Sequence, residues 1–166
     1  MTRRELIGMA SVGVIAAALG GPYAFSLLAP DRRARPAAGA KSDAQWRALL
    51  SPAAFRVLRQ GATEKPYSST LLKEHRAGTF LCAGCDKPLF ESRTKYDSRT
   101  GWPSFWDVMP GAVSKLEDRS LGMSRTEVRC TQCDGHLGHV FDDGPQPTGL
   151  RYCMNGVAMA FAPARA

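Results

Sequence analysis

Two Cys-x-x-Cys pairs constrain the fold of this chain more than any other feature of its 166 residues. The first pair lies in "FLCAGCDKPLF" and the second in "VRCTQCDGHLGH", with 44 residues between them. A two-residue gap lets both sulfurs of one turn face the same ion, and two such turns supply four thiolates for a tetrahedral site. One ion would then hold two distant hairpins together, so that metal binding would contribute to folding. The pairs predict a zinc site with four ligands: Cys82, Cys85, Cys130 and Cys133.

Three other uses of these cysteines stay open. Each pair could be a redox dithiol of the thioredoxin-like kind, the four could form disulfides in an exported protein, or the thiolates could bind iron. Two redox dithiols in such similar surroundings are a less economical explanation than one shared ion. We therefore expect one structural Zn²⁺ per chain.

The hydrophobic pattern predicts two short helices followed by a small β domain. Trp46, Leu49 and Leu50 have helical spacing, Ser51-Pro52 supplies an N-cap and a first-turn proline, and Gly61 is a plausible stop. Short apolar segments separated by Gly, Pro, Asp and Ser then indicate a mostly antiparallel β domain, so the fold class is mainly β (α+β). The expected strands are Thr79–Leu81, Pro88–Phe90, Ala112–Leu116, Arg125–Val128, Val140–Phe141, Arg151–Met154 and Val157–Phe161.

Residues 1–41 have the composition of an export signal followed by a linker. Arg3-Arg4 precede a run from Leu6 to Leu28 without charged side chains, which resembles a twin-arginine signal peptide. A membrane anchor is the alternative, because 23 uncharged residues are long enough to span a bilayer. Ala38-Gly39-Ala40 is a possible cleavage site. We expect an exported protein of the bacterial periplasm, with a membrane-associated N-terminus as the alternative, and a folded domain over residues 42–166.

The positive charge of the chain does not indicate nucleic-acid binding. The formal net charge is +7, but residues 1–41 carry six Lys/Arg against two acidic residues. A duplex-binding surface needs a dense basic stripe, and residues 42–166 contain none. We therefore expect no nucleic-acid partner.

Cys153 is the one cysteine that the two pairs leave over. A lone cysteine in a strand is ordinarily a buried apolar residue, but this one follows a tract rich in titratable groups. A cysteine with histidine and acid nearby has the outline of a catalytic nucleophile, and nearby cations favour its thiolate. The groups within this tract are His136, His139, Asp142, Asp143 and Arg151.

From about Gly61 to Phe161 the chain closely resembles the B-type methionine sulfoxide reductases, which act on the R epimer. The stretches that carry the resemblance are "TKYDSRTGWPSFW", "GMSRTEVRC", "CDGHLGHVFDDGPQPTGLRYCMN" and both Cys-x-x-Cys turns. The resemblance implies two antiparallel β-sheets with peripheral helices, a zinc site remote from the chemistry, and a nucleophilic Cys153. The usual substrate of that family is methionine-R-sulfoxide in oxidised proteins or peptides, which the resemblance implies for this chain.

The resemblance also implies roles for residues around the nucleophile. Trp102 would form the apolar seat for the substrate methyl group, although a core residue in a Gly-Trp-Pro turn is the alternative. One of the two histidines could instead serve only to bind backbone, and Asp142 has the character of a solvated loop residue. The remaining implied site residues are His136, His139 and Asp143 as a polar wall, with Asn155 and Arg151 shaping the pocket.

One position departs from many relatives. They keep a resolving cysteine just before the Gly-Trp-Pro turn, where this chain has Thr100, preceded by Arg99 instead of glycine. With four cysteines on zinc, Cys153 has no internal partner. We therefore expect its sulfenic acid to be reduced by an external reductant, a thioredoxin-like protein or another thiol. The alternative from a different class is a zinc-binding β module for protein interaction, without catalysis.

Overall fold

The computed structural model describes residues 41–165. Nearly all of the predicted export or anchor segment therefore lies outside the described residues, and both the export and the domain boundary at residue 42 stay predictions. Within the described part, no helix has the length and apolar character needed to cross a membrane.

Two short helices precede the β domain, as expected: α1 (Asp43–Leu49) and α2 (Pro52–Gln60). Ser42 caps α1 in a capping box, and the Ser51 hydroxyl accepts a hydrogen bond from the third residue of α2. Gly61 ends α2 in the left-handed conformation (φ 69°), which glycine adopts without steric cost. The local sequence alone therefore specifies where both helices begin and where α2 ends.

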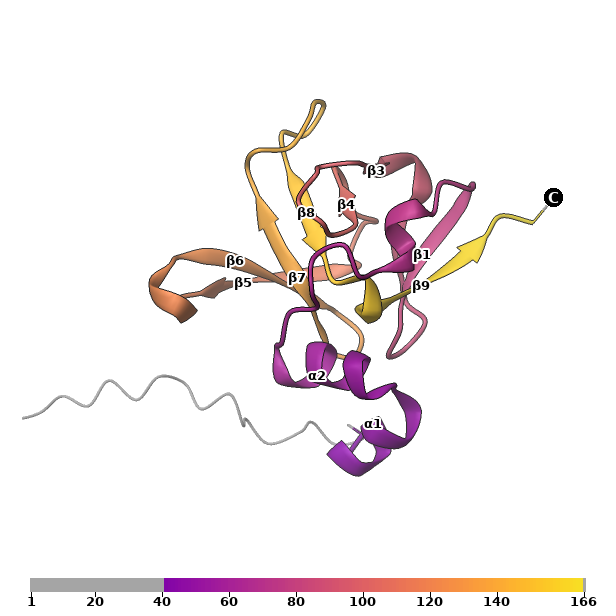
Figure 1. Ribbon diagram of the computed structural model, residues 1–166, viewed down its shortest axis with the longest axis vertical. Helices are drawn as coiled ribbons and strands as arrows, with labels where there is room; N and C mark the ends of the chain where they lie inside the picture. Colours follow the sequence, from indigo (N-terminus) through magenta and orange to yellow (C-terminus); the bar gives the residue numbers. More distant parts are fainter. Residues whose placement is uncertain (1–40, 166) are drawn as a thin grey trace, which may run out of the picture. The chain divides into compact units, whose positions relative to one another are not determined.

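The β domain confirms the expected fold class, with two antiparallel sheets. Three strands form one sheet in the order β2-β1-β9, and six form the other in the order β3-β4-β8-β7-β6-β5 (Figure 1). The hairpin of β5 and β6 extends beyond the rest of the domain in this view. The strands are β1 (Gly78–Cys82), β2 (Pro88–Glu91), β3 (Lys95–Tyr96), β4 (Ser104–Phe105), β5 (Val113–Asp118), β6 (Arg125–Cys130), β7 (His136–Phe141), β8 (Arg151–Met154) and β9 (Met159–Pro163).

A cluster of aromatic side chains lies within the hydrophobic core. Phe80 of β1 and Phe90 of β2 pack on Phe105 of β4, with ring centroids 4.9 and 4.3 Å apart, and Tyr152 of β8 closes the cluster. The three phenylalanines are fully buried, and burial of each such side chain contributes about 2–3 kcal/mol. Because Phe105 and Tyr152 are cross-strand partners, the residues next to them in each strand point to the opposite face of the larger sheet.

Some predicted strand boundaries were wrong. β7 begins at His136 and not at Val140, and the short strands β3 and β4 were not predicted. Residues 157–158 belong to a 3₁₀ turn, η4 (Gly156–Ala158), so that β9 starts only at Met159. The missed strand residues include histidine, glycine and serine, whose extended conformation comes from pairing with neighbouring strands and not from their own preference.

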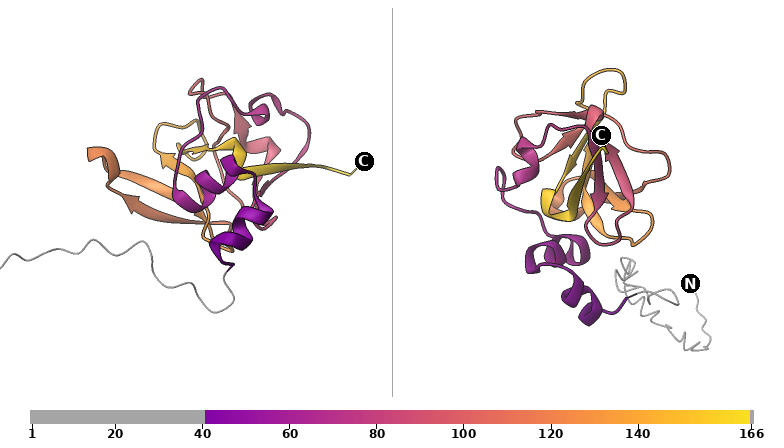
Figure 2. Two further views of the ribbon diagram at one scale, coloured as in Figure 1. Left: turned by 60° about the horizontal axis from the view of Figure 1, so that its bottom comes forward. Right: turned by 90° about the vertical axis from the view of Figure 1, so that its right-hand side faces the viewer.

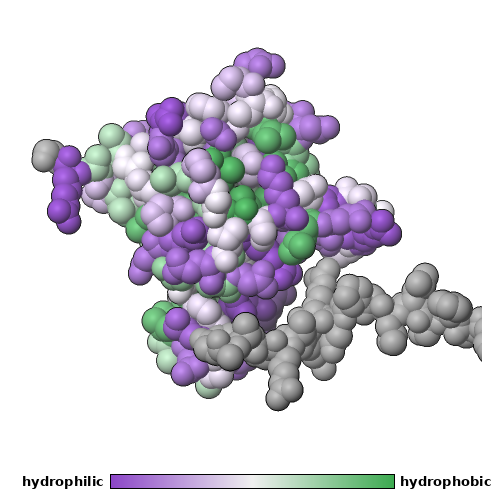
Figure 3. All heavy atoms as spheres, turned by 180° about the vertical axis from the view of Figure 1, so that it is seen from behind, coloured by the Kyte–Doolittle hydropathy of each residue, from purple (hydrophilic) through white to green (hydrophobic). Residues whose placement is uncertain are grey.

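The two helices lie together at one end of the β domain (Figures 1 and 2). There α2 contacts β7 and η4, and its Leu58 packs so closely on Gly135 that a Cβ at this glycine would lie 2.8 Å from the leucine. On the face shown in Figure 3, hydrophobic atoms lie in small groups among hydrophilic ones.

Candidate active site and metal centre

Cys153 lies on the outer face of the larger sheet because of the alternation in β8. Tyr152 and Met154 point into the core and are buried, whereas Cys153 is half-buried. Its cross-strand partners are Ser104 on β4 and His139 on β7. The strand period of two thus places the thiol beside an imidazole and away from the packed interior.

An irregularity in β7 brings both histidines together. The pairing with β6 shifts between Val128 and Arg129, so that His139 lies opposite Glu127 while His136 lies opposite Arg129. The extra residue in β7 is the mark of a β-bulge, which lets two residues three positions apart share a face. The two imidazole rings lie 5.5 Å apart, centre to centre.

Gly138, at this bulge, permits the close approach of β7 and β8. A Cβ there would collide with the carbonyl oxygen of Cys153 and lie 3.0 Å from the Cα of Met154. A larger residue would therefore push the histidine strand away from the cysteine strand.

Each histidine contacts its own carboxylate. His136 Nδ1 lies 2.7 Å from Glu127 Oε1, and His139 Nε2 lies 2.9 Å from Asp118 Oδ2. These acids come from β6 and from the end of β5, and both are buried. Neither acid was selected from the sequence. The available signal concerned Glu127, which is an acidic residue within "RTEVRC", a segment with the pattern of a β-strand.

Burial alone would raise the pKa of both carboxyls, but their partners reverse this effect. Hydrogen bonds from His136 and Arg129 lower the pKa of Glu127 to about 2. Hydrogen bonds from His139 and Ser120 hold the pKa of Asp118 well below its usual range. Both acids are therefore anionic at neutral pH, and each can accept a hydrogen bond from an imidazole N–H group.

The two imidazoles differ in the environment of their ring nitrogens. Burial lowers the pKa of His139, partly offset by Asp118. The Nε2 atom of His136 is buried and has no hydrogen-bond partner among the described residues. With Nδ1 directed at Glu127, Nε2 is the ring nitrogen of His136 that can exchange a proton with a bound molecule.

Hydroxyl groups surround the other side of the thiol. Thr100 Oγ1 lies 3.7 Å from Cys153 Sγ and 2.8 Å from Ser98 Oγ. Ser98 in turn lies 2.6 Å from Ser104 Oγ. The position where many relatives have a resolving cysteine is therefore directly beside the candidate nucleophile, and here it carries a hydroxyl.

Asp143 and Arg151 form a pair of their own. Both carboxylate oxygens of Asp143 accept hydrogen bonds of 2.8 Å from the guanidinium, which also lies over the Phe141 ring. This bidentate pair lowers the pKa of Asp143. Asp143 was expected to form a polar wall with the two histidines, but the hydrogen bonds of the described residues join the imidazoles to Glu127 and Asp118 instead.

Trp102 and Asn155 flank the cysteine strand. Trp102 is half-buried in the turn before β4, and its indole donates a 3.2 Å hydrogen bond to the carbonyl of Glu64. Asn155 is buried directly after β8, and its side chain donates to the carbonyl of Leu137 on β7. Both lie within two residues of the β4–β8 pairing at Cys153.

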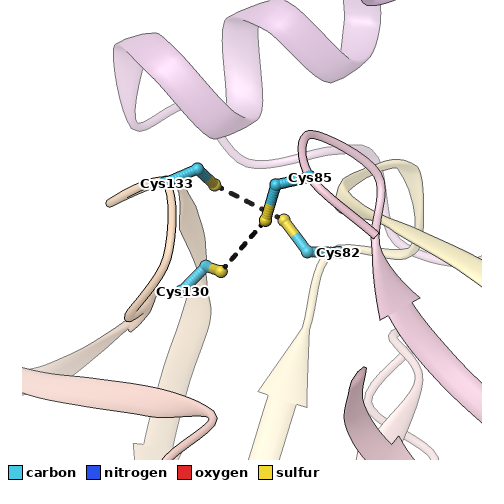
Figure 4. A group of neighbouring side chains, drawn as sticks. All are labelled: Cys82, Cys85, Cys130 and Cys133. Carbon is cyan, nitrogen blue, oxygen red and sulfur yellow. Dashed lines mark hydrogen bonds between the residues drawn. The ribbon is translucent and has the colours of Figure 1, made fainter. Parts of the chain in front are cut away.

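The other four cysteines converge on one point (Figure 4). Cys82 and Cys85 come from the β1–β2 turn of one sheet, and Cys130 and Cys133 come from the β6–β7 turn of the other. All four sulfurs lie within 4.8 Å of one another, with Cys85 and Cys130 3.5 Å apart and Cys82 and Cys133 3.6 Å apart. These separations exclude disulfide bonds, whose sulfurs are about 2 Å apart.

The sulfur positions fit a tetrahedral metal ion. Metal–sulfur bonds of about 2.3 Å imply sulfurs about 3.8 Å apart, close to the observed spacing. The crowded thiols also lower the pKa of Cys130, chiefly through a hydrogen bond from Cys133, and raise those of its neighbours Cys82 and Cys133. The cluster is a possible metal site that would join the two sheets.

Together, the fold and the site define a small β protein with one half-buried cysteine beside a histidine and a separate four-cysteine cluster. Residues 50–163 match the model of the SelR domain. The chain therefore belongs to the SelR family.

Curated relatives with the name peptide methionine sulfoxide reductase MsrB span most of the chain. The Agrobacterium fabrum protein is 52% identical over 124 residues, covering 74% of this chain and 92% of the relative. The Leifsonia xyli protein is 56% identical over 126 residues, covering 75% and 91%. The Bradyrhizobium diazoefficiens protein is 55% identical over 124 residues, covering 74% and 89%.

Proposed function

We propose that this chain is a peptide-methionine (R)-S-oxide reductase with Cys153 as its nucleophile. The relatives named above support an oxidoreductase that acts on peptide methionine sulfoxide. The observation that carries the assignment of Cys153 is its position. It is the one cysteine outside the four-sulfur cluster, and it is the cross-strand partner of His139.

In the first step, the Cys153 thiolate attacks the sulfoxide sulfur and forms a sulfur–sulfur bond while the oxygen gains a proton. The protonated oxygen then moves to the cysteine sulfur as the sulfur–oxygen and sulfur–sulfur bonds break, and the thioether leaves. The substrate sulfur is reduced by two electrons to the thioether, and Cys153 is oxidised by two electrons to the sulfenic acid. Proton transfer during the attack is needed because an unprotonated oxide is a poor leaving group. Either His136 or His139 supplies this proton, each oriented by its own carboxylate, and Trp102 seats the methyl group.

An external thiol or dithiol protein completes the cycle. The position where many relatives have a resolving cysteine is occupied by Thr100, whose hydroxyl lies beside the Cys153 sulfur. The four remaining cysteines cluster with one another. An external thiol attacks the sulfenic sulfur, releases water and forms a mixed disulfide, which a second thiol reduces.

The four-cysteine centre binds Zn²⁺ in this proposal. Four thiolates in tetrahedral arrangement without an open position are the usual ligand set of a structural zinc ion. Its chemistry is to hold the two sheets together, and no step of the reaction passes through it. The N-terminal segment is proposed to direct export to the periplasm, which a reporter fused after residue 41 would test.

The test is reduction of a racemic peptide methionine sulfoxide with dithiothreitol. We expect half of the substrate to be consumed, the R epimer only, and no turnover by Cys153→Ser. Cys133→Ser is the matched control, because it also removes one thiol. It should lower metal content and stability, and so distinguishes loss of the metal site from loss of the nucleophile. Turnover by Cys153→Ser, or absence of turnover by the wild type, would refute the proposal.

A further inference from the structure

Glu64 has contacts that the proposed mechanism does not use. It lies half-buried in the segment between α2 and the 3₁₀ turn η1 (Thr70–Lys73), well away in sequence from the cysteine strand. Its carboxylate accepts hydrogen bonds from the backbone N–H groups of Gly156 (2.5 Å) and Val157 (3.0 Å). These two residues begin η4, which follows the cysteine strand directly and is the short helical turn before β9 in Figure 1. Two charge-assisted bonds thus attach this segment to the end of β8.

The backbone of Glu64 makes the other half of the connection. Its N–H donates to Asn155 Oδ1 at 2.9 Å, and its carbonyl accepts from the Trp102 indole at 3.2 Å. The Trp102 ring nitrogen has no second acceptor among the hydrogen bonds of the described residues. One residue therefore holds the indole on one side and the end of the cysteine strand on the other.

The packing at this point is close. A Cβ on Gly156 would collide with the Ser69 hydroxyl and lie 3.3 Å from Glu64 Oε1. The segment that contains Glu64 and Ser69 thus lies directly against η4. A larger residue at position 156 would push this segment away from η4.

We propose that Glu64 is a positioning residue that sets the separation between the Trp102 indole and Cys153, and thereby the size of the S-alkyl group that the site accepts. The inference rests on the proposed function, in which Trp102 seats that alkyl group. Backbone pairing fixes β4 against β8, but the orientation of the indole above this pairing depends on the Glu64 carbonyl. Removing the carboxylate releases the carbonyl's segment from η4, so the alkyl seat widens without loss of the nucleophile or the proton donors.

The test compares peptides that contain methionine sulfoxide with peptides that contain the S-ethyl analogue. One methylene in an apolar pocket is typically worth about 10–200-fold in kcat/KM, so the wild type should prefer the methyl substrate by about tenfold or more. Glu64→Ala should raise KM for the methyl substrate about tenfold and lower the methyl-to-ethyl preference at least fivefold, with kcat changed less than threefold. Glu64→Gln, which keeps one acceptor oxygen, should fall between the two.

A matched control is Glu91→Ala, because Glu91 is a partly exposed acid on β2 that pairs only with Arg93 among the described ion pairs. It should leave both KM and the preference unchanged. In a Trp102→Phe background, Glu64→Ala should no longer alter the preference, because residues that act through one another are not additive.

The outcomes separate the two proposals. No turnover by the wild type would overturn the proposed function and this inference together. Normal wild-type turnover with an unchanged methyl-to-ethyl preference in Glu64→Ala would overturn the inference alone, and so would additive effects with Trp102→Phe. If Glu64→Ala does not fold, an unchanged preference in Glu64→Gln overturns it equally.

Discussion

A cysteine at position 100 should convert this chain into an enzyme with its own resolving thiol. Thr100 Oγ1 lies 3.7 Å from Cys153 Sγ, and the two residues are 53 positions apart. In Thr100→Cys, the new sulfur would replace the hydroxyl beside the nucleophile and attack its sulfenic acid, with release of water. Closing a loop of this length removes about 4 kcal/mol of chain entropy from the unfolded state, an upper limit that strain would reduce.

Mass analysis and denaturation measure these effects. After one turnover, wild type should carry one extra oxygen on Cys153, whereas Thr100→Cys should contain a Cys153 bridge and no free sulfenic acid. Oxidised Thr100→Cys should require more denaturant than its reduced form by up to about 4 kcal/mol of unfolding free energy. Thr100→Ser, which keeps the hydroxyl, should behave as wild type. A Thr100→Cys protein that turns over without forming the bridge would refute the inferred geometry.

Three further predictions concern the metal and the buried acids. Chelation should lower the thermal midpoint steeply and release about one zinc per chain, because metal-binding energy is folding energy; an unchanged midpoint would contradict a structural metal. The folded pKa of Glu127 is about 2, below its ordinary 4.5. Its contribution to the free energy of unfolding is therefore fully present above pH 4.5 and is lost as the pH falls toward 2. Glu127→Gln should therefore cost on the order of 2 kcal/mol at pH 7 and flatten the loss of stability over that acid range, as urea unfolding at several pH values would show. Asp118→Asn should lower kcat about 10–100-fold by removing the anion that orients His139, whereas Asp143→Asn should change it less than about fivefold; equal kcat effects would contradict these assignments.

Much of the site was accessible from the sequence because local patterns carry it. The Cys-x-x-Cys spacing specifies turns whose sulfurs converge, and the structure places all four within reach of one ion. Ser42, Ser51 and Gly61 mark helix ends through contacts within a few residues. Such features depend on chain geometry over three or four positions, which the order of residues determines directly.

The partners of the histidines were not accessible in the same way. The family resemblance grouped Asp143 with the two histidines, but its carboxylate pairs with Arg151. Asp118 and Glu127 reach the imidazoles only because β5 and β6 lie beside β7 in the sheet. Glu64 was also missed, since its partners lie 38 to 93 positions further along the chain.

Residue order by itself thus determined the family resemblance, the metal-type turns, the helix ends and the identity of the unpaired thiol. The tertiary structure alone decided which acid contacts each imidazole, which face of the sheet Cys153 occupies, and which group the Trp102 indole hydrogen-bonds. The physical reason is that strand pairing and a single bulge join residues far apart in the chain, and a one-residue change in that register would direct the same side chains to the opposite face.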